Sequence, residues 1–183
     1  QHALIEASHY SKIPVVEIQH GRIDSHLGYD FPQTPSLQAF PDYLLIWGDF
    51  WRENANIPLP DDRVITVGYP WLDRGVNRFA GVGTSEHILF ISNPSNGKAL
   101  SQFAVECAED GRLSDNIVYK LHPKECDDWQ HRYPWLLNDE IRVIDGQTPS
   151  LYELFAESRA QVGIRSSAMY EGLCFELETY VYS

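Results

Sequence analysis

The sequence predicts an α/β protein whose second half forms a Rossmann-like domain with a parallel sheet. From about Ser85 onward, apolar segments of about five residues alternate with segments of about ten residues that have helical spacing. The apolar segments are nearly continuous, as strands are when both faces of a sheet are covered. Strands and helices in this order form βαβ units with right-handed crossovers, and such units build a parallel sheet.

Before Ser85 the same alternation is interrupted by a long loop. The first helix is expected over 1–12, where apolar residues have helical spacing and Pro14 closes the helix. Residues 21–40 contain proline and glycine and little periodicity, which is typical of a loop. The other elements expected here are strands over 14–19, 42–47 and 62–68 and a helix or turn over 48–54.

The glycine-rich segment 80–87 is the best candidate for a domain boundary. We therefore expect residues 1–84 to be the end of an N-terminal α/β domain with its linker, and residues 85–183 to be the Rossmann-like domain. Its expected strands cover 87–93, 116–122, 141–145, 160–165 and 178–182, with helices over 96–111, 150–158 and 166–176 and a helical or irregular crossover over 124–136.

The composition disfavours several classes of protein. The 183 residues carry a formal net charge of −12, which disfavours binding to nucleic acid or to an anionic membrane surface. No apolar run approaches the roughly 20 residues that a membrane helix needs. The cysteines Cys107, Cys126 and Cys174 are scattered, which argues against a disulfide framework and against a zinc site. These features predict a cytoplasmic protein without a metal, and its sequence does not indicate membrane association.

Both ends of the sequence suggest a fragment. The chain starts at Gln1 without a methionine and stops at Ser183, where an expected strand has just begun. We therefore expect part of the functional unit to lie outside this sequence, including any region that would hold the protein at the inner membrane.

An imidazole follows the expected strand 116–122. His122 ends this strand, and Pro123 can extend neither a ladder nor a helix, so the histidine is expected at the carboxyl edge of the sheet, where α/β proteins bind ligands. There His122 can donate to a phosphate or ribose oxygen. Lys120 lies two residues earlier and projects to the same side of the strand, where it can add a positive charge.

Two other junctions of the second domain carry polar residues. Ser92 and Asn93 follow one strand, with Ser95 just before a helix. Ser166 and Ser167 separate another strand from a helix, so one of them is expected to cap that helix, whose free N–H groups suit a phosphate oxygen. Glu171 lies one helical turn beyond Ser167, where it can accept hydrogen bonds from a ribose. Each junction taken singly also fits a plain cap or turn.

The first domain has a comparable junction at Gln19, His20 and Gly21. Gly21 permits a sharp turn or the close approach of a substrate, and the pKa range of histidine suits His20 to act as a general base. Asp24, His26 and Tyr29 in the following loop could orient His20 or contact a substrate. The spacing of six between the histidines is not that of helical metal ligands, so we expect no zinc site.

Taken in order, these motifs resemble two-domain transferases of the GT-B fold. The motifs are IPVVEIQHG, PDYLLIWGDFW, VITVGYP, YKLHPKE and RSSAMYEGL, and the resemblance covers most of the chain. The nearest similarity is to CDP-glycerol glycerophosphotransferase-like enzymes of surface-polymer and teichoic-acid synthesis. Bacterial sialyltransferases and polysialyltransferases share a His-Pro motif and a Ser-Ser motif of this kind.

The resemblance implies a role for each junction. The first domain would hold the acceptor, a carbohydrate or polyol phosphate, near Gln19, Gly21 and Tyr29, with His20 as the general base. The second domain would bind a CMP-, CDP- or UDP-linked donor and would need no other cofactor. Its nucleotide and phosphate ligands would be Lys120, His122, Pro123, Ser166, Ser167 and Glu171, together with Ser92 and Asn93. The reaction would transfer a glycosyl or glycerophosphate group.

Three other interpretations remain open. A UDP-N-acetylglucosamine 2-epimerase-like isomerase has the same two-domain fold, but it should show a carboxylate-rich site, and no pair of acids is convincingly spaced for one. A non-catalytic module could keep the fold and bind a nucleotide only. A plain α/β domain could use the polar junctions as caps and turns.

Overall fold

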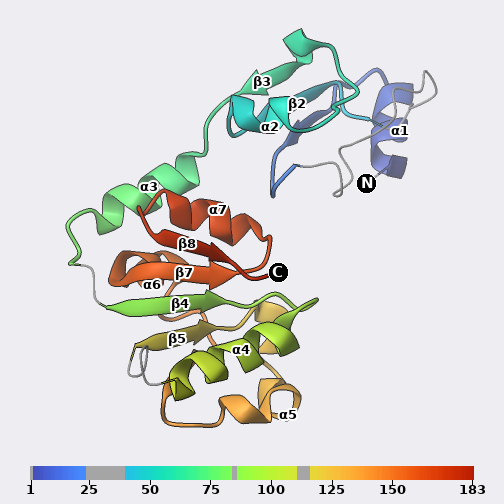
Figure 1. Cartoon of the computed structure of the whole chain (residues 1–183). Coiled ribbons are helices and arrows are strands. Elements are labelled where there is room, and N and C mark those ends of the chain that lie inside the picture. The colour runs from blue at the N-terminus through green and yellow to red at the C-terminus, as the bar shows by residue number, and fades with distance from the viewer. Residues whose placement is uncertain (1, 24–39, 84–85, 111–115) are drawn as a thin grey trace. The chain divides into compact units, whose positions relative to one another are not determined.

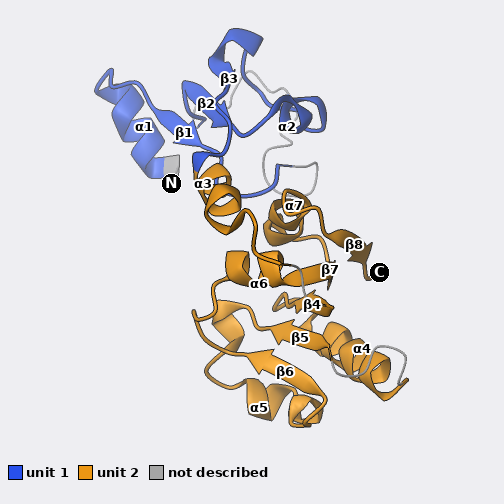
Figure 2. Cartoon of the chain, turned by 90° about the vertical axis from the view of Figure 1, so that its left-hand side faces the viewer, with its two compact units in different colours: residues 1–70 blue, residues 71–183 orange. Residues whose placement is uncertain are grey.

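The computed structural model of the protein describes residues 2–23, 40–83, 86–110 and 116–183. The chain forms two compact units, Gln1–Pro70 and Trp71–Ser183, shown in different colours in Figure 2. The border between them falls after the first residue of the helix α3 (Pro70–Phe79), before the glycine-rich segment that follows this helix. The reason lies in the packing of α3, where a Cβ at Gly75 would lie 2.1 Å from the ring of Tyr152 in the second unit.

The first unit contains a three-stranded parallel sheet in the order β1-β2-β3. Its strands are short, and the segment between β1 and β2 includes the residues outside the described ranges. In chain order its elements are α1 (His2–Tyr10), β1 (Val16–Ile18), β2 (Tyr43–Ile46), α2 (Asp49–Glu53), the 3₁₀ turn η1 (Asp61–Arg63) and β3 (Val64–Thr66).

Among the described residues, the core cluster of this sheet lies on one face. Leu44, Ile46 and Val64 point to that face and pack with Trp51 of α2 and with Ile23. The alternation of side chains along a strand places the next residues on the opposite face. There the apolar side chains of Val16, Ile18, Tyr43 and Ile65 are exposed.

The second unit contains a five-stranded sheet in the order β6-β5-β4-β7-β8, and all its neighbouring strands are parallel. This is the doubly wound order 3-2-1-4-5. The strands are β4 (His87–Ile91), β5 (Ile117–Lys120), β6 (Ile141–Ile144), β7 (Ser158–Gly163) and β8 (Glu178–Val181). The connecting helices are α4 (Gly97–Glu109), α5 (Trp129–Arg132), α6 (Leu151–Glu157) and α7 (Ser167–Leu173), with 3₁₀ turns η2 (Pro123–Glu125) and η3 (Pro134–Leu136).

Both faces of the second sheet are covered, as the nearly continuous apolar strands predict. Ile88 and Phe90 of β4 point to the face covered by α4, where Leu100 and Ala104 meet them. Leu89 and Ile91 point the other way, into the cluster that α6 and α7 complete. Figure 2 shows α4 and α6 on opposite sides of the sheet. The prediction of an α/β fold with a Rossmann-like parallel sheet is confirmed.

Two boundaries differ from the prediction. β7 begins at Ser158, directly after α6, although polar residues there suggest a helix end and a loop. Ser158 is buried because its hydroxyl donates to the carbonyl of Leu154 (2.7 Å), and Arg159 pairs with Glu86 (3.4 Å). α7 ends at Leu173, before the predicted end, because the chain turns at Glu176 with a φ of 60°.

Candidate functional site

The carboxyl ends of the strands of the second unit meet at one edge of the sheet (Figure 1). Ile91 at the end of β4 lies beside Lys120 of β5 on one side and beside Gly163 of β7 on the other. The chain therefore proceeds from β4 in one direction through β5 and β6, and later in the other through β7 and β8. In open α/β sheets, ligands bind in the crevice at such a reversal, which makes the residues after β4, β5 and β7 the candidates.

His122 follows β5 at this edge and takes the N-cap position of the turn η2. Its Nδ1 accepts a hydrogen bond from the backbone N–H of Lys124 (3.1 Å), and Pro123 occupies the first position of the turn. The side chain is partly exposed, and within the described residues its Nε2 makes no hydrogen bond. The outer nitrogen of this imidazole is therefore open to a ligand.

Glu125 is a residue of this edge that sequence reasoning missed. It is fully buried at 0% exposure, and its Oε2 accepts a hydrogen bond from the backbone N–H of His122 (3.0 Å). Its Oε1 accepts one from the hydroxyl of Tyr133 (2.5 Å), and burial together with this carboxylate raises the pKa of Tyr133. The only sequence signal was the spacing of three residues from His122 to Glu125, which is that of a capping box. This signal is obscured because histidine is not a usual N-cap residue.

Ser92 and Asn93 at the end of β4 have structural partners. Ser92 is buried, and its hydroxyl accepts a hydrogen bond from Tyr119 (3.1 Å), whose hydroxyl also lies 3.2 Å from the carbonyl of Gly97. Burial raises the pKa of Tyr119 to about 12. The Asn93 side chain accepts the backbone N–H of Ser95 (3.0 Å) and so shapes the turn into α4.

Lys120 links two neighbouring strand ends. Its ammonium group donates to the carbonyl of Gly146, in the turn after β6. Burial lowers the pKa of Lys120, while the nearby Cys126 and Asp145 act in the opposite direction. The cation predicted at this edge is present, and it holds the turn that follows β6.

Ser166 and Ser167 lie between β7 and α7, as expected. Ser166 is the N-cap residue, but its side chain makes no capping hydrogen bond, and within the described residues its buried Oγ has no partner. Its carbonyl accepts from the N–H of Met169 (3.1 Å), which begins the helix. Ser167 is the first residue of α7. An orphaned hydroxyl at a strand-to-helix junction is the kind of group that a ligand oxygen can satisfy.

Glu171 is held by a neighbouring helix. Its Oε2 accepts a hydrogen bond from the hydroxyl of Tyr152 in α6 (2.6 Å). Close packing sets the position of α7, because a Cβ at Gly172 would lie 2.2 Å from the side-chain oxygen of Gln161 in β7. The carboxylate predicted for the ribose is therefore present at the candidate edge with a defined orientation.

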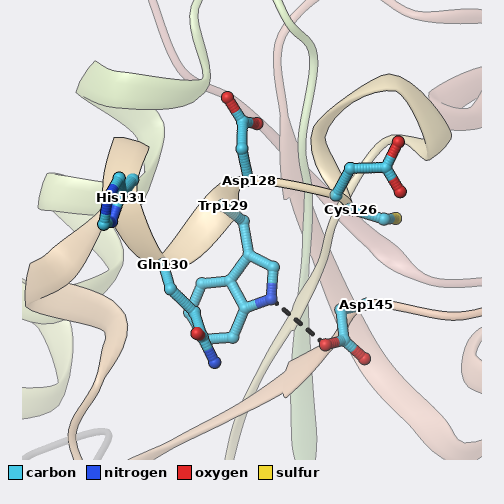
Figure 3. Close-up of a pocket in the computed structure, with 7 residues that line it drawn as sticks. Cys126, Asp128, Trp129, Gln130, His131 and Asp145 are labelled. Carbon is cyan, nitrogen blue, oxygen red and sulfur yellow. Dashed lines mark hydrogen bonds between the residues drawn. The ribbon is translucent and has the colours of Figure 1, made fainter.

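A pocket of about 460 Å³ opens beside the turn that carries His122 (Figure 3). Trp129 is one of its lining residues, and its indole N–H donates to the carboxylate of Asp145 (3.1 Å), the residue after β6 (Figure 3). The thiol of Cys126 is 3.5 Å from the carbonyl of His122. The lining residues are Cys126, Asp127, Asp128, Trp129, Gln130, His131 and Asp145.

The predicted site residues of the first unit have different surroundings. Gln19 is buried at 3% exposure and bridges two strand ends, because its side chain accepts the N–H of Trp47 (2.8 Å) and donates to the carbonyl of Gly21 (2.8 Å). His20 is exposed at the same end of β1. Tyr29 lies outside the described residues, as do the other loop residues proposed to orient His20.

The described ranges contain neither a metal-binding cluster nor a membrane-spanning helix. No group of three or more histidine, cysteine, aspartate or glutamate side chains is arranged there to hold a metal ion. In the same ranges, none of the helices has both the length and the apolar character needed to cross a membrane.

Comparison with known proteins gives matches to solved structures only. No family model and no curated protein matches the chain. The UDP-GlcNAc 2-epimerase of Methanocaldococcus jannaschii, solved in complex with UDP-GlcNAc and UDP, matches 98% of this chain with 15% identity and a TM-score of 0.64. The wall teichoic acid polymerase TagF matches 94% with 15% identity and a TM-score of 0.53. The UDP-GlcNAc 2-epimerase of Neisseria meningitidis matches 98% with 16% identity and a TM-score of 0.55.

These matches cover 56%, 49% and 55% of the matched proteins, so the chain spans about half of their length. At this level of identity the similarity concerns the fold. Both transferases and epimerases that use nucleotide-activated sugars or alcohols have this fold. The chain is therefore structurally similar to GT-B enzymes, and its two parallel sheets correspond to about half of such a protein.

Proposed function

We propose that the second unit binds the nucleotide part of an activated donor, and that the protein transfers a glycosyl or glycerophosphate group from this donor to a surface-polysaccharide-type acceptor. The observation that carries the proposal is the position of His122. Its open Nε2 lies at the carboxyl edge of the sheet, after β5, while the orphaned hydroxyl of Ser166 follows β7 on the other side of β4. Ligands of doubly wound sheets bind at this place.

The two groups suit a diphosphate. A neutral imidazole with its proton on Nε2 donates a hydrogen bond to an oxygen, and a serine hydroxyl does the same. Hydrogen bonds to a charged phosphate are stronger than those between neutral groups. Donors held in place before the reaction stabilise the negative charge that builds up on the leaving nucleotide.

Glu171 supports the ribose assignment. A carboxylate accepts hydrogen bonds from sugar hydroxyls, and the Oε2 of Glu171 is held in place by the hydroxyl of Tyr152. Lys120 contributes positive charge at the same edge, and Ser92 and Asn93 shape the start of α4 beside it. In this proposal these last three residues maintain the site rather than contact the phosphate.

For the first unit we propose that His20 removes the proton of the acceptor hydroxyl. His20 is exposed at the carboxyl end of β1, and the Gln19 side chain fixes the turn that follows it. General-base catalysis requires an accessible imidazole within hydrogen-bond reach of the substrate.

The first test is a calorimetric titration of the chain with CMP, CDP, UDP and GDP. It is repeated with His122→Ala and with the matched control His87→Ala, which changes a histidine at the opposite end of β4. We expect one nucleotide diphosphate to saturate the chain, and we expect His122→Ala to weaken it about tenfold or more, the loss of one charge-assisted hydrogen bond. His87→Ala should leave the affinity unchanged.

The absence of binding by all four nucleotides would refute the proposed donor site. Equal losses in the two histidine variants would refute the role of His122. The identity of the bound nucleotide also separates the two enzyme classes, because a chain that takes only UDP should next be incubated with UDP-GlcNAc and assayed for epimerisation at C2. Formation of the epimer would replace the transferase proposal.

A further inference from the structure

We infer that Glu125 is a positioning residue for His122, which it holds as a single tautomer with Nε2–H directed to the nucleotide phosphate. This inference rests on the proposed function for its ligand, but its structural part concerns the ligand-free protein. Glu125 itself is buried and does not reach the ligand, so it acts only through the histidine.

The carboxylate of Glu125 is clamped from two sides. His122 donates its backbone N–H to Oε2 (3.0 Å), and Tyr133 donates its hydroxyl to Oε1 (2.5 Å). A third element closes the site, since a Cβ at Gly97 would lie 2.4 Å from Oε1 and 2.3 Å from the hydroxyl of Tyr133. Gly97 starts α4, so the buried carboxylate packs between this helix start and Tyr133.

The backbone of the turn η2 extends these restraints to the imidazole of His122. Glu125 also donates its backbone N–H to the carbonyl of His122 (2.8 Å), so the backbone of the histidine is held at both its N–H and its C=O. Pro123 restricts the turn further because its φ is fixed. The backbone N–H of Lys124 then points at Nδ1 of the imidazole, at 3.1 Å.

This last hydrogen bond selects the tautomer. A nitrogen that accepts an N–H cannot carry a proton itself, so Nδ1 is the acceptor of the neutral ring and the proton resides on Nε2. The nitrogen open to the ligand is therefore a donor. Phosphate oxygens accept hydrogen bonds and do not donate them, so this tautomer is the one that can bind the donor nucleotide.

A second capping box in the same unit shows that capping alone does not require such burial. At the start of α6 the Glu153 side chain accepts the N–H of Ser150 (2.7 Å), as Glu125 accepts that of His122, and the serine hydroxyl accepts the N–H of Glu153 (3.3 Å). Glu153 is only partly buried. Complete burial of a carboxylate, as in Glu125, costs free energy. Of these two capping boxes, the one with the fully buried glutamate is the one whose N-cap side chain lies at the candidate site.

The structural part is tested by ¹⁵N NMR of the imidazole and by amide exchange of Lys124 in the ligand-free chain. The variants are Glu125→Ala, Glu125→Gln and Tyr133→Phe, with Glu153→Ala as the matched control. In the unmodified chain we expect a pyridine-type Nδ1, a pyrrole-type Nε2 and a protected Lys124 amide. Glu125→Ala should give averaged tautomers and a rapidly exchanging Lys124 amide.

Glu125→Gln should restore the single tautomer, because the side-chain amide can accept from His122 and donate to the oxygen of Tyr133. Tyr133→Phe should loosen the tautomer without removing the carboxylate, which keeps the test valid if Glu125→Ala does not fold. A single tautomer and a protected Lys124 amide in folded Tyr133→Phe or Glu125→Ala would overturn the inference. So would a tautomer change in Glu153→Ala.

The ligand part is tested by a double-mutant cycle with CDP as the probe. Glu125→Ala and His122→Ala should each weaken CDP about tenfold, and the double variant should lose about tenfold as well, because Glu125 acts only through His122. Cytidine, which lacks the phosphates, should lose nothing in any of them. Additive losses of about a hundredfold, or equal losses for cytidine, would show a general structural role and overturn the inference.

The two proposals fail in different ways. If the unmodified chain binds no nucleotide, the proposed function fails while the NMR variants still decide whether Glu125 positions His122. If CDP binds but the imidazole behaves identically in every variant, the proposed function stands and the positioning role of Glu125 is wrong.

Discussion

Replacing Gly172 by alanine tests the contact that seats α7 on the second sheet. The new Cβ would lie 2.2 Å from the Oε1 of Gln161, 2.6 Å from its Cδ and 2.7 Å from its Nε2. Since ordinary contact begins at 3.4 Å, the amide group must move by roughly 1 Å. Gln161 has little freedom to do so because it is fully buried, at 0% exposure.

The cost follows from what Gln161 holds. Its Nε2 donates to the carbonyl of Met169 (2.9 Å) and to the hydroxyl of Thr179 (2.8 Å), so a displacement strains or breaks both bonds. Two buried hydrogen bonds are worth about 1 kcal/mol each, and overpacking adds about 1–3 kcal/mol. Alanine regains about 1 kcal/mol as a better helix former. We expect a net loss of about 3 kcal/mol.

Native-state hydrogen exchange of the buried β7 amides, such as that of Val162, measures this loss directly. The matched control is Gly83→Ala, because a Cβ there would meet nothing within 4 Å, and it should change the exchange free energy by less than about 0.5 kcal/mol. In a Gln161→Ala background the penalty of Gly172→Ala should largely disappear. An unchanged exchange free energy in Gly172→Ala, or a full penalty in that background, would refute the packing argument.

Three further predictions concern the first unit. Ile46→Ala should lower the free energy of unfolding by about 2–5 kcal/mol in urea denaturation, because Ile46 is fully buried. The control Ile65→Ala, on the exposed face, should cost less than about 1 kcal/mol. Similar losses in the two variants would contradict the one-sided core. The hydrogen bond from the N–H of Val15 (2.8 Å) lowers the pKa of Asp42 below 3.8, so the unfolded state binds its proton first and the unit loses stability as the pH falls below about 4. Asp42→Asn should remove this part of the acid dependence, and an unaltered acid profile would count against it. His20→Ala should reduce transfer by about 10²–10⁴-fold without changing nucleotide affinity, and an unchanged transfer rate would exclude it as the general base.

The alternation of apolar strands and helical segments was sufficient to predict the α/β class and the parallel sheet of the second unit. Residues such as those of HILFI and IVYK are apolar at nearly every position because both faces of the sheet are buried. Their positions also placed His122, Ser92 and Ser166 at strand ends. Sequence pattern determines these features because side-chain periodicity follows directly from backbone geometry.

The sequence was less informative where polar residues find partners far along the chain. Ser158 and Arg159 look like a helix end and a loop, but the pairing of Ser158 with His87 of β4 and the ion pair of Arg159 with Glu86 make them the start of β7. In the first unit, the sequence does not reveal that the Gln19 side chain joins the ends of two strands.

What the sequence determined by itself is therefore the order of the elements and the presence of a histidine beyond a strand end. Only the tertiary structure decided that Glu125 is buried against Tyr133, that Gly97 leaves room for its carboxylate and that Nε2 of His122 is the open nitrogen. The physical reason is that these properties depend on which groups meet across three elements. No local pattern of residues encodes a contact between a turn, a helix start and a distant hydroxyl.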